Sequence, residues 1–291
     1  MSANFLLEHG SFGTRAVLTA PWSDSFIAPL REKRILELEL NEAKGWRGSD
    51  IEFVANFPEL EVFEILDFKI PSVKPVNLLG KLRKLKVYTY CNTELLFSKF
   101  PLLEECLIEW REGAKSLFDA VWLRELFVNR YKGQDLRSFN KLINLTSLMM
   151  LGAPITSLAG IESLKKLTKL RLGDLRRLQS LRGIERLTAL QSLRVIACRK
   201  IGRIDEVASL INLRDLSLNN NGPIASLKPL DSIGKLESVM FYDSTNILDG
   251  DLSPLTRQEH LSNVSFQNRR HYSHRREDFW QYGAPLPYIT K

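Results

Sequence analysis

The chain has 291 residues, of which 44% are hydrophobic and 26% charged, and this composition is typical of a globular protein of one or two domains. No apolar run of about eighteen residues occurs, and the opening MSANFLLEHGSFGTR lacks the basic start and long apolar core of a signal peptide. These features argue against a disordered or a membrane-spanning chain, and we expect a cytoplasmic, intracellular protein.

The net charge of +7 belongs to the second half of the chain. Residues 1–130 carry 17 Lys and Arg against 19 Asp and Glu, whereas residues 131–291 carry 24 against 15. An excess of positive charge at one end favours a partner with an acidic surface, and nucleic acid is one such partner.

Residues 1–34 show no repeated spacing. They contain four aromatic residues, Phe5, Phe12, Trp22 and Phe26. Aromatic side chains of this kind are usually at least partly buried, so we expect the segment to pack against the next part of the chain.

A repeated apolar spacing begins at Ile35. Its clearest copy is NLRDLSLNNN, in which Leu213, Leu216 and Leu218 are followed by Asn221 in the ninth place. The same frame starts at residues 35, 60, 82, 103, 123, 145, 167, 190, 213, 236 and 261, so that the units are 20–25 residues long. It is most regular from residue 145 to 245, where ITSLAGIESL, LQSLRGIERL and IASLKPLDSI repeat the second half of the unit as well.

Simple chemistry predicts the structure of one unit. Leucines at the fourth and sixth places alternate, so both point to one face of a short strand. The strand then ends in a turn whose backbone groups need partners, and an amide side chain such as that of Asn221 can supply them. The next apolar residues are three apart, which fits a 3-10 turn behind the strand, and they are Ile224, Leu227, Leu230 and Ile233.

The frame and its period resemble those of the leucine-rich-repeat family. The resemblance implies an α/β solenoid, a curved horseshoe with a parallel β-sheet on its concave face and short helical, 3-10 or irregular segments on its convex face. We expect about eleven repeats over residues 35–269, an N-terminal cap over residues 1–34, and a C-terminal cap and tail over residues 270–291 that closes the stack with Phe279, Trp280 and Tyr282. The ninth place holds Asn at Asn221 and Cys at Cys198 but varies elsewhere, so a regular asparagine ladder is not expected.

The sequence contains no recognisable catalytic or metal-binding motif. Phosphate-binding loops, HExxH and GxSxG are all missing, and the three cysteines form no CxxC pair. His271 and His274 are three residues apart with no further ligand nearby in sequence, and two solvated residues of a basic cap are a simpler interpretation than a metal site. We therefore predict a protein that is not an enzyme and has no cofactor.

In a solenoid of this kind the third, fifth and seventh places of each frame point to the concave face, which is the expected binding surface. Three zones succeed one another along the chain: an acidic zone in the first repeats, with Glu37, Glu39 and Glu64; then an apolar zone; then a basic zone. The predicted partner-binding residues are Tyr88, Leu107, Glu109, Phe127, Asn129, Met149, Leu151, Lys169, Arg171, Arg194, Ile196, Met240 and Tyr242.

The main hypothesis is a module that binds a partner protein with an acidic and apolar surface. Phe127, Met149 and Leu151 would anchor the partner, and Arg171 and Arg194 would pair with its acidic groups. Alternatively, a cap or neighbouring segment covers these apolar residues, or the looser repeats are misframed. By analogy of fold alone, the module would act as an inhibitor, such as a toxin-neutralising immunity protein, or as a regulatory adaptor.

A second class of function is contact with nucleic acid through the basic C-terminal half. Arg176, Arg177, Arg182 and Arg186 fall in one repeat, and Arg199, Lys200 and Arg203 occupy corresponding places in the next. Such a convex stripe could neutralise phosphates, but it lacks the interleaved aromatic residues that stack on bases. A solvated face is the simpler interpretation.

Overall fold

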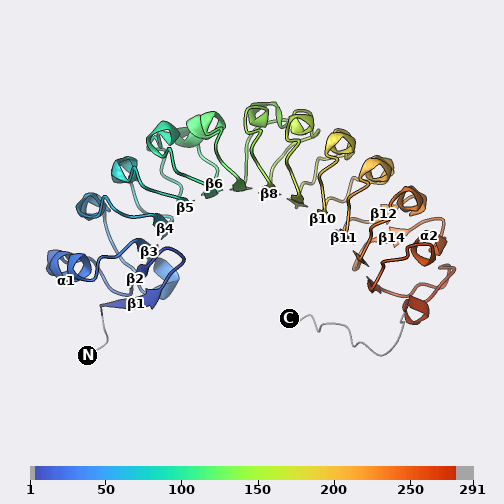
Figure 1. Cartoon of the computed structure of the whole chain (residues 1–291), viewed down its shortest axis with the longest axis horizontal. Coiled ribbons are helices and arrows are strands. Elements are labelled where there is room, and N and C mark those ends of the chain that lie inside the picture. The colour runs from blue at the N-terminus through green and yellow to red at the C-terminus, as the bar shows by residue number, and fades with distance from the viewer. Residues whose placement is uncertain (1–3, 280–291) are drawn as a thin grey trace. The chain divides into compact units, whose positions relative to one another are not determined.

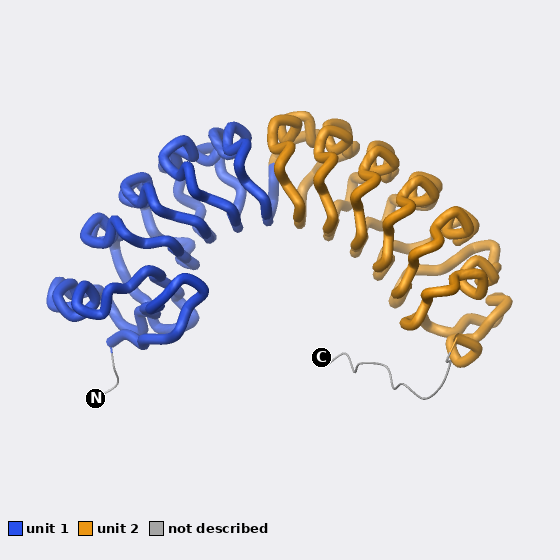
Figure 2. Tube along the Cα trace, in the orientation of Figure 1, with its two compact units in different colours: residues 1–131 blue, residues 132–291 orange. Residues whose placement is uncertain are grey.

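The computed structural model describes residues 4–279. The chain divides into two compact units, unit 1 over residues 1–131 and unit 2 over residues 132–291 (Figure 2). In each unit the strands lie side by side along one side, and short helical turns, most of them 3-10 helices, lie along the other (Figure 1).

Unit 1 begins with an antiparallel hairpin, β1 paired with β2, and continues as a parallel sheet from β2 to β7 in chain order. Its strands are β1 (Phe5–His9), β2 (Thr14–Leu18), β3 (Glu37–Asn41), β4 (Val62–Leu66), β5 (Lys84–Tyr88), β6 (Glu105–Glu109) and β7 (Glu125–Asn129). Its helices are η1 (Asp24–Phe26), α1 (Ile27–Glu32), η2 (Glu42–Lys44), η3 (Glu52–Asn56), η4 (Lys74–Leu78), η5 (Phe97–Lys99) and η6 (Glu112–Asp119), of which α1 alone is α-helical.

Unit 2 continues the same plan, with a parallel sheet in the order β8, β9, β10, β11, β13, β15 and a separate two-stranded sheet of β12 and β14. Its strands are β8 (Ser147–Leu151), β9 (Lys169–Gly173), β10 (Ser192–Ile196), β11 (Asp215–Asn219), β12 (Pro223–Ile224), β13 (Ser238–Phe241), β14 (Asn246–Ile247) and β15 (Asn263–Phe266). Its helices are η7 (Arg137–Phe139), η8 (Ile161–Ser163), η9 (Ile184–Arg186), η10 (Asp205–Ser209), η11 (Lys228–Ser232), α2 (Ser253–Thr256) and η12 (Arg276–Phe279).

Every predicted frame carries a strand in the expected place. Each strand from β3 onwards in the two long sheets begins two residues after a predicted start, from Glu37 after Ile35 to Asn263 after Leu261. The fourth and sixth places are buried throughout, as Leu216 and Leu218 are, and Cys106 is a fully buried core residue of β6. The predicted α/β solenoid, with strands on one side and 3-10 turns on the other, is confirmed.

The turns after five strands of unit 2, β8, β9, β10, β11 and β13, use a left-handed backbone conformation. Gly152, Asp174, Ala197, Asn220 and Asp243 all occupy the eighth place of the frame, with φ between 51° and 61°. The N–H group of this residue still belongs to the ladder, as when Ala197 N donates to Asn219 O at 3.0 Å. The left-handed residue therefore ends the strand without losing a hydrogen bond and turns the chain toward the 3-10 side.

The predicted role of Asn221 is also confirmed. Its side chain is fully buried; Oδ1 accepts from Cys198 N at 2.9 Å and Nδ2 donates to Val195 O at 2.7 Å. Thr245 satisfies the turn one repeat later, because its hydroxyl accepts a hydrogen bond from Asn221 N and donates one to Leu218 O. Different polar side chains thus satisfy successive turns, which explains why the ninth place is not uniformly asparagine.

Candidate functional site

The outward side of each long sheet, opposite the 3-10 turns, carries the third, fifth and seventh places, and we call it the sheet face. In unit 2 it brings together a basic group, Lys169, Arg171 and Arg194, which we call the basic sheet patch. Arg171 on β9 lies directly opposite Arg194 on β10, and Met149 on β8 lies opposite Arg171 on its other side. Lys169 and Arg194 are exposed and Arg171 is half-buried.

The basic sheet patch has no internal counter-ion. None of its three side chains takes part in an ion pair or a side-chain hydrogen bond within residues 4–279, and Nε of Arg171 is buried without a partner. Like charges directly opposite one another on neighbouring strands destabilise a sheet. The positive charges of the patch are therefore not compensated by any carboxylate within residues 4–279.

Apolar side chains flank the basic sheet patch. Leu151 and Ile196 lie at the carboxyl ends of β8 and β10, with Gly173 of β9 between them in register. A Cβ atom at position 173 would overlap Cδ2 of Leu151, so the glycine makes room for the leucine to lie across β9. Met240 and Tyr242 are half-buried and lie further along, on and just after β13, and Tyr242 Oη is hydrogen-bonded to Ser265 Oγ.

The predicted residues of unit 1 form a smaller group on that unit's own sheet face. Tyr88 and Phe127 meet edge to face with ring centroids 6.1 Å apart, and Leu107 of β6 lies in register with Phe127. The Nζ atom of Lys86 lies 5.3 Å from the centroid of the Tyr88 ring. Burial, and then the negative charge of Glu109, raise the pKa of Tyr88 to about 12, so its hydroxyl keeps its proton.

Glu109 and Asn129, both predicted to bind a partner, are hydrogen-bonded to each other. Glu109 is only 4% exposed, and Asn129 Nδ2 donates to its Oε2 at 2.7 Å. Arg130 Nε lies 3.6 Å from the other carboxylate oxygen. The two residues satisfy each other, and this leaves the aromatic pair and Leu107 as the accessible part of the unit 1 group.

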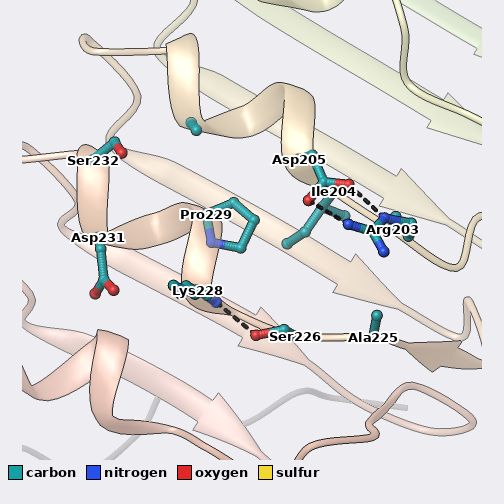
Figure 3. Close-up of a pocket in the computed structure, with 10 residues that line it drawn as sticks. Arg203, Ile204, Asp205, Ala225, Ser226, Lys228, Pro229, Asp231 and Ser232 are labelled. Carbon is teal, nitrogen blue, oxygen red and sulfur yellow. Dashed lines mark hydrogen bonds and ion pairs between the residues drawn. The ribbon is translucent and has the colours of Figure 1, made fainter.

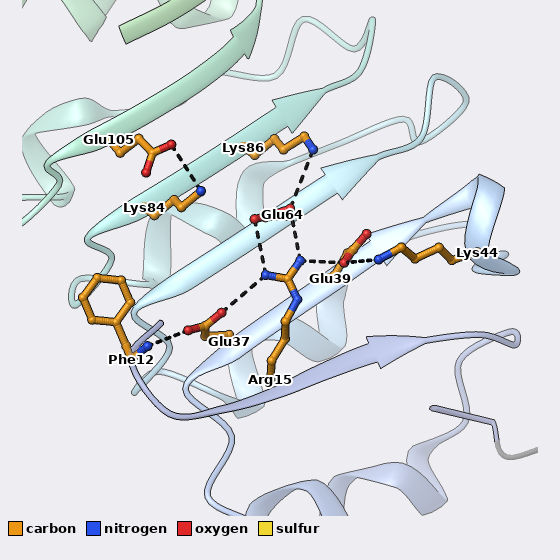
Figure 4. Close-up of polar contacts among 9 residues, drawn as sticks. All are labelled: Phe12, Arg15, Glu37, Glu39, Lys44, Glu64, Lys84, Lys86 and Glu105. Carbon is orange, nitrogen blue, oxygen red and sulfur yellow. Dashed lines mark hydrogen bonds and ion pairs between the residues drawn. The ribbon is translucent and has the colours of Figure 1, made fainter. Parts of the chain in front are cut away.

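The acidic zone of the first repeats is internally neutralised, which the repeat frame does not reveal. Arg15 of β2 reaches over the sheet face, with Nη2 at 2.6 Å from Glu39 Oε2 and 3.3 Å from Glu64 Oε2, and Nη1 at 3.4 Å from Glu37 Oε2 (Figure 4). Lys44 Nζ lies 2.8 Å from Glu39 Oε2. The signal for Arg15 in the sequence is its place in the alternating TRAVL segment, which lies outside the repeat frame.

These contacts control the ionisation of Glu39. Burial alone would raise the pKa of its carboxyl, but hydrogen bonds from Arg15, Lys44 and Asn41 outweigh burial and lower this pKa to about 2. For Arg15, burial opposes the charged form, while the hydrogen bonds and charges of Glu39 and Glu64 raise the pKa of the guanidinium above its ordinary value. Glu39 and Arg15 are therefore both ionised throughout the neutral range.

The outer, 3-10 side of unit 2 has a groove between η10 and η11 (Figure 3). Its charged groups are largely paired with each other or with neighbours: Arg203 Nε lies 2.6 Å from Asp205 Oδ2, and Arg257 Nη2 lies 2.7 Å from Asp231 Oδ1. Arg176 of the predicted convex stripe is likewise 2.9 Å from Asp174. The other cations of that stripe, Arg177, Arg182, Arg186, Arg199 and Lys200, form no ion pair within residues 4–279, so the outer side of unit 2 also carries unpaired positive charge.

Within residues 4–279 no group of three or more His, Cys, Asp or Glu is arranged to hold a metal ion. His271 Nε2 lies 2.9 Å from Ile247 O, and His274 Nδ1 lies 2.8 Å from Ser273 Oγ, so each ring has a local partner. No helix in the described part of the chain is both long enough and apolar enough to cross a membrane. Trp280 and Tyr282, predicted for the C-terminal cap, lie outside the described residues.

Strands at a period of 20–25 residues, 3-10 turns behind them and polar turn ladders define a leucine-rich-repeat solenoid, and the chain is a leucine-rich-repeat protein by fold. No protein-family model and no curated protein matches its sequence. An internalin (InlF) from Listeria monocytogenes has a TM-score of 0.64 at 17% identity, over 84% of this chain and 73% of that one.

Two further solved structures show the same fold. Internalin C2 of Listeria monocytogenes has a TM-score of 0.51 at 18% identity, covering 64% of this chain and 83% of its own. A leucine-rich-repeat protein of Leptospira interrogans has a TM-score of 0.53 at 14% identity, covering 87% of this chain and 77% of its own. At these identities the likeness establishes the fold.

Proposed function

We propose that the chain binds a partner protein through the sheet face of its repeats. The basic sheet patch of unit 2 would pair with acidic groups of the partner, and Met149, Leu151 and Ile196 would supply the apolar contacts beside it. The observation that carries the proposal is the contrast between the two sheet faces. The carboxylates of unit 1 are held by Arg15 and Lys44, whereas Arg171 and Arg194 face each other and have no carboxylate partner in the described part of the chain.

General properties of interfaces support this assignment. Arginine, methionine and tyrosine are enriched at binding surfaces, and energetically important residues cluster with apolar neighbours that exclude water. In unit 1 the group of Tyr88, Leu107 and Phe127 has the same chemistry, and we propose it as an apolar contact for the partner. Such a protein would act by occupying a partner's surface, as an inhibitor, an immunity protein or an adaptor, without turnover.

The test is affinity capture from a nuclease-treated lysate of the native cell with three versions of the chain. These are the wild type, the double variant Arg171→Glu/Arg194→Glu, and the control Arg177→Glu, which reverses an exposed charge just after the turn of the repeat that carries Arg171. We expect a protein that is retained by the wild type and by the control and is lost from the double variant.

Two results would contradict the proposal. If the double variant and the wild type retain the same proteins with the same affinity, the basic sheet patch is not the site. If material is retained only from a lysate without nuclease treatment, and its retention falls steeply with salt, contact with nucleic acid through the basic half replaces protein binding.

A further inference from the structure

The sheet face of unit 2 holds two arginines directly opposite each other. Arg171 on β9 and Arg194 on β10 are in register, and neighbouring strands are about 4.8 Å apart. Both side chains project from the same face, and neither forms an ion pair or a side-chain hydrogen bond within residues 4–279. Two adjacent cations repel each other, and a single anion that contacts both of them removes this repulsion.

Two serine hydroxyls border the arginine pair. Ser217 of β11 lies in register with Arg194, and Ser192 of β10 lies in register with Lys169. Ser217 is only 4% exposed, and neither hydroxyl forms a hydrogen bond in the described part of the chain. The group therefore offers two guanidiniums, one ammonium and two hydroxyls as donors, and this set suits an anion with several acceptor oxygens.

The positively charged part of this face is only two strands wide. The fifth place holds Met149 on β8 on one side, and Ser217 and then Met240 on the other. The outward places of β8–β11 include no aromatic residue that could stack on a base. Because nucleic acid needs a row of cations that follows successive phosphates, the small patch with apolar neighbours favours one phosphate on a peptide.

The paired arginines favour a doubly charged anion over a carboxylate. A side-chain carboxylate carries one negative charge and would leave one of the two guanidiniums uncompensated. A phosphorylated side chain carries a charge of about −1.5 to −2 at neutral pH and has three acceptor oxygens, so it can compensate both. The planar guanidinium binds such oxygens through two parallel hydrogen bonds.

We propose that the basic sheet patch binds the phosphate of a phosphorylated serine, threonine or tyrosine in the partner protein. This inference rests on the proposed function, because it names the chemical group through which the partner is held. Arg171 and Arg194 contact the phosphate oxygens, and Ser217 donates a further hydrogen bond. Met149 and Leu151 contact apolar residues of the partner beside the phosphorylated residue.

The test uses pools of short fluorescein-labelled peptides with random flanks and a fixed central residue, which is phosphoserine, phosphotyrosine, glutamate or serine. Binding to the full chain is measured by fluorescence anisotropy at about 0.15 M salt, which screens weak surface attraction. We expect at least one phosphorylated pool to bind at least about tenfold more tightly than the glutamate pool, because phosphate has more charge and more acceptor oxygens. The serine pool should bind most weakly.

Substitutions assign this preference to the patch. Arg171→Gln/Arg194→Gln should abolish it, whereas Arg177→Gln, which removes an exposed cation from the outer side of the same repeat as Arg171, should leave it unchanged. Arg194→Gln alone alters an exposed side chain and should weaken binding of the phosphorylated pool by at least about threefold. This single variant decides the result if the double variant does not fold.

Asp215 provides a variant with the opposite effect. It is exposed at the third place of β11, in register with Ser192 and diagonal to Arg194, and it forms no ion pair within residues 4–279. Its negative charge repels a phosphate bound between the arginines. We therefore expect Asp215→Asn to strengthen binding of the phosphorylated pool by about twofold.

Three results would overturn the inference. The first is equal affinity for the phosphorylated and glutamate pools, and the second is a preference for phosphate that survives the double variant. The third is tighter binding of labelled single-stranded DNA that depends on Arg171 and Arg194, since nucleic acid would then be the ligand of the patch.

Phosphatase treatment of the cell lysate separates this inference from the proposed function. A partner that the chain captures equally before and after the treatment, and that Arg171→Glu/Arg194→Glu loses, would support the proposed function and contradict the phosphate. A partner that only the untreated lysate yields, and that the same double variant loses, would support both.

Discussion

Ala197 occupies a left-handed backbone conformation, φ 57°, that glycine adopts without steric cost. We expect Ala197→Gly to raise the free energy of unfolding by about 0.5–1 kcal/mol, because relief of strain exceeds the added entropy of the unfolded chain. Urea unfolding monitored by circular dichroism would measure the change. The control is Ala208→Gly in η10, which should lower stability by about 0.5–1 kcal/mol; a loss of stability in both variants would refute this explanation.

A substitution at Asn221 tests how much the polar side chains that satisfy the turns contribute to stability. Asn221→Ala would leave Cys198 N and Val195 O buried without partners, so we expect it to lower the free energy of unfolding by about 3 kcal/mol. The control is Asn212→Ala, which removes a more exposed amide bonded to Thr188 O and should cost less than about 1 kcal/mol. Equal costs for both variants would show that the ladder contributes no special stability.

Single residues divide clearly into those that the sequence predicts and those that it does not. Asn221 could be predicted because it has a fixed place in the repeat frame, and Arg171 and Arg194 could be predicted as outward-facing for the same reason. The ion pairs of Arg15 could not be predicted, since they join side chains from elements far apart in the chain. The contact between Arg111 and Cys91 could not be predicted either, because it joins side chains from turns outside the strand frame. A frame states which way a side chain points but not which other side chain it meets.

At the scale of elements, the strand β2 stabilises the start of the sheet through Arg15. We expect Arg15→Met to lower the free energy of unfolding by about 3 kcal/mol, because it leaves the carboxylates of Glu37, Glu39 and Glu64 crowded without their shared cation. Thermal unfolding would measure the loss. Lys33→Met, which removes an exposed positive charge just after α1, is the control and should change stability by less than about 0.5 kcal/mol.

A strand or helix could be predicted from the sequence where its buried residues recur at a regular spacing. The strands of the repeat frame alternate buried and outward residues, and their positions follow directly from the spacing of the leucines. Strand β1 is half-buried only at Phe5 and exposed along the rest of its length, so it has no apolar alternation to detect. The two-residue strands β12 and β14 are too short to produce any periodicity.

At the scale of the whole molecule, acid should affect the two units differently. The pKa of Glu39 is about 2 in the folded chain against an ordinary 4.5, so its contribution to stability is complete above about 4.5 and is lost as the pH falls toward 2. The basic sheet patch loses no ion pair on acidification. We therefore expect hydrogen exchange at pH 3 to accelerate in β2–β4 before β9–β11.

The variant Glu39→Gln provides the control for this pH dependence. It should be less stable than the wild type at pH 7, and the difference in stability between the two should shrink as the pH falls below about 4.5. Acceleration of exchange in β9–β11 first, or a stability difference independent of pH, would show that the Arg15 cluster does not govern acid sensitivity.

The sequence predicts which residues of the candidate site share one surface, but it does not predict which of their charges are paired. The repeat frame placed the basic sheet patch and its apolar neighbours on one face of unit 2, where they lie. It also placed an acidic zone in the first repeats, but it could not show that Arg15, from outside the frame, neutralises this zone. Net charge along a sequence counts groups, whereas binding depends on which of them remain unpaired in space.

The spacing of the strands has a consequence for any extended segment that crosses the sheet face of unit 2. Neighbouring strands are about 4.8 Å apart, whereas an extended peptide in the polyproline II conformation advances about 3.1 Å per residue with three residues per turn, so two strand steps match three residues of the peptide. Every third residue of such a peptide therefore takes the same position above every second repeat. Met149 on β8 and Arg194 on β10 are two repeats apart, so they would contact an apolar and an acidic residue that are three positions apart in the bound peptide.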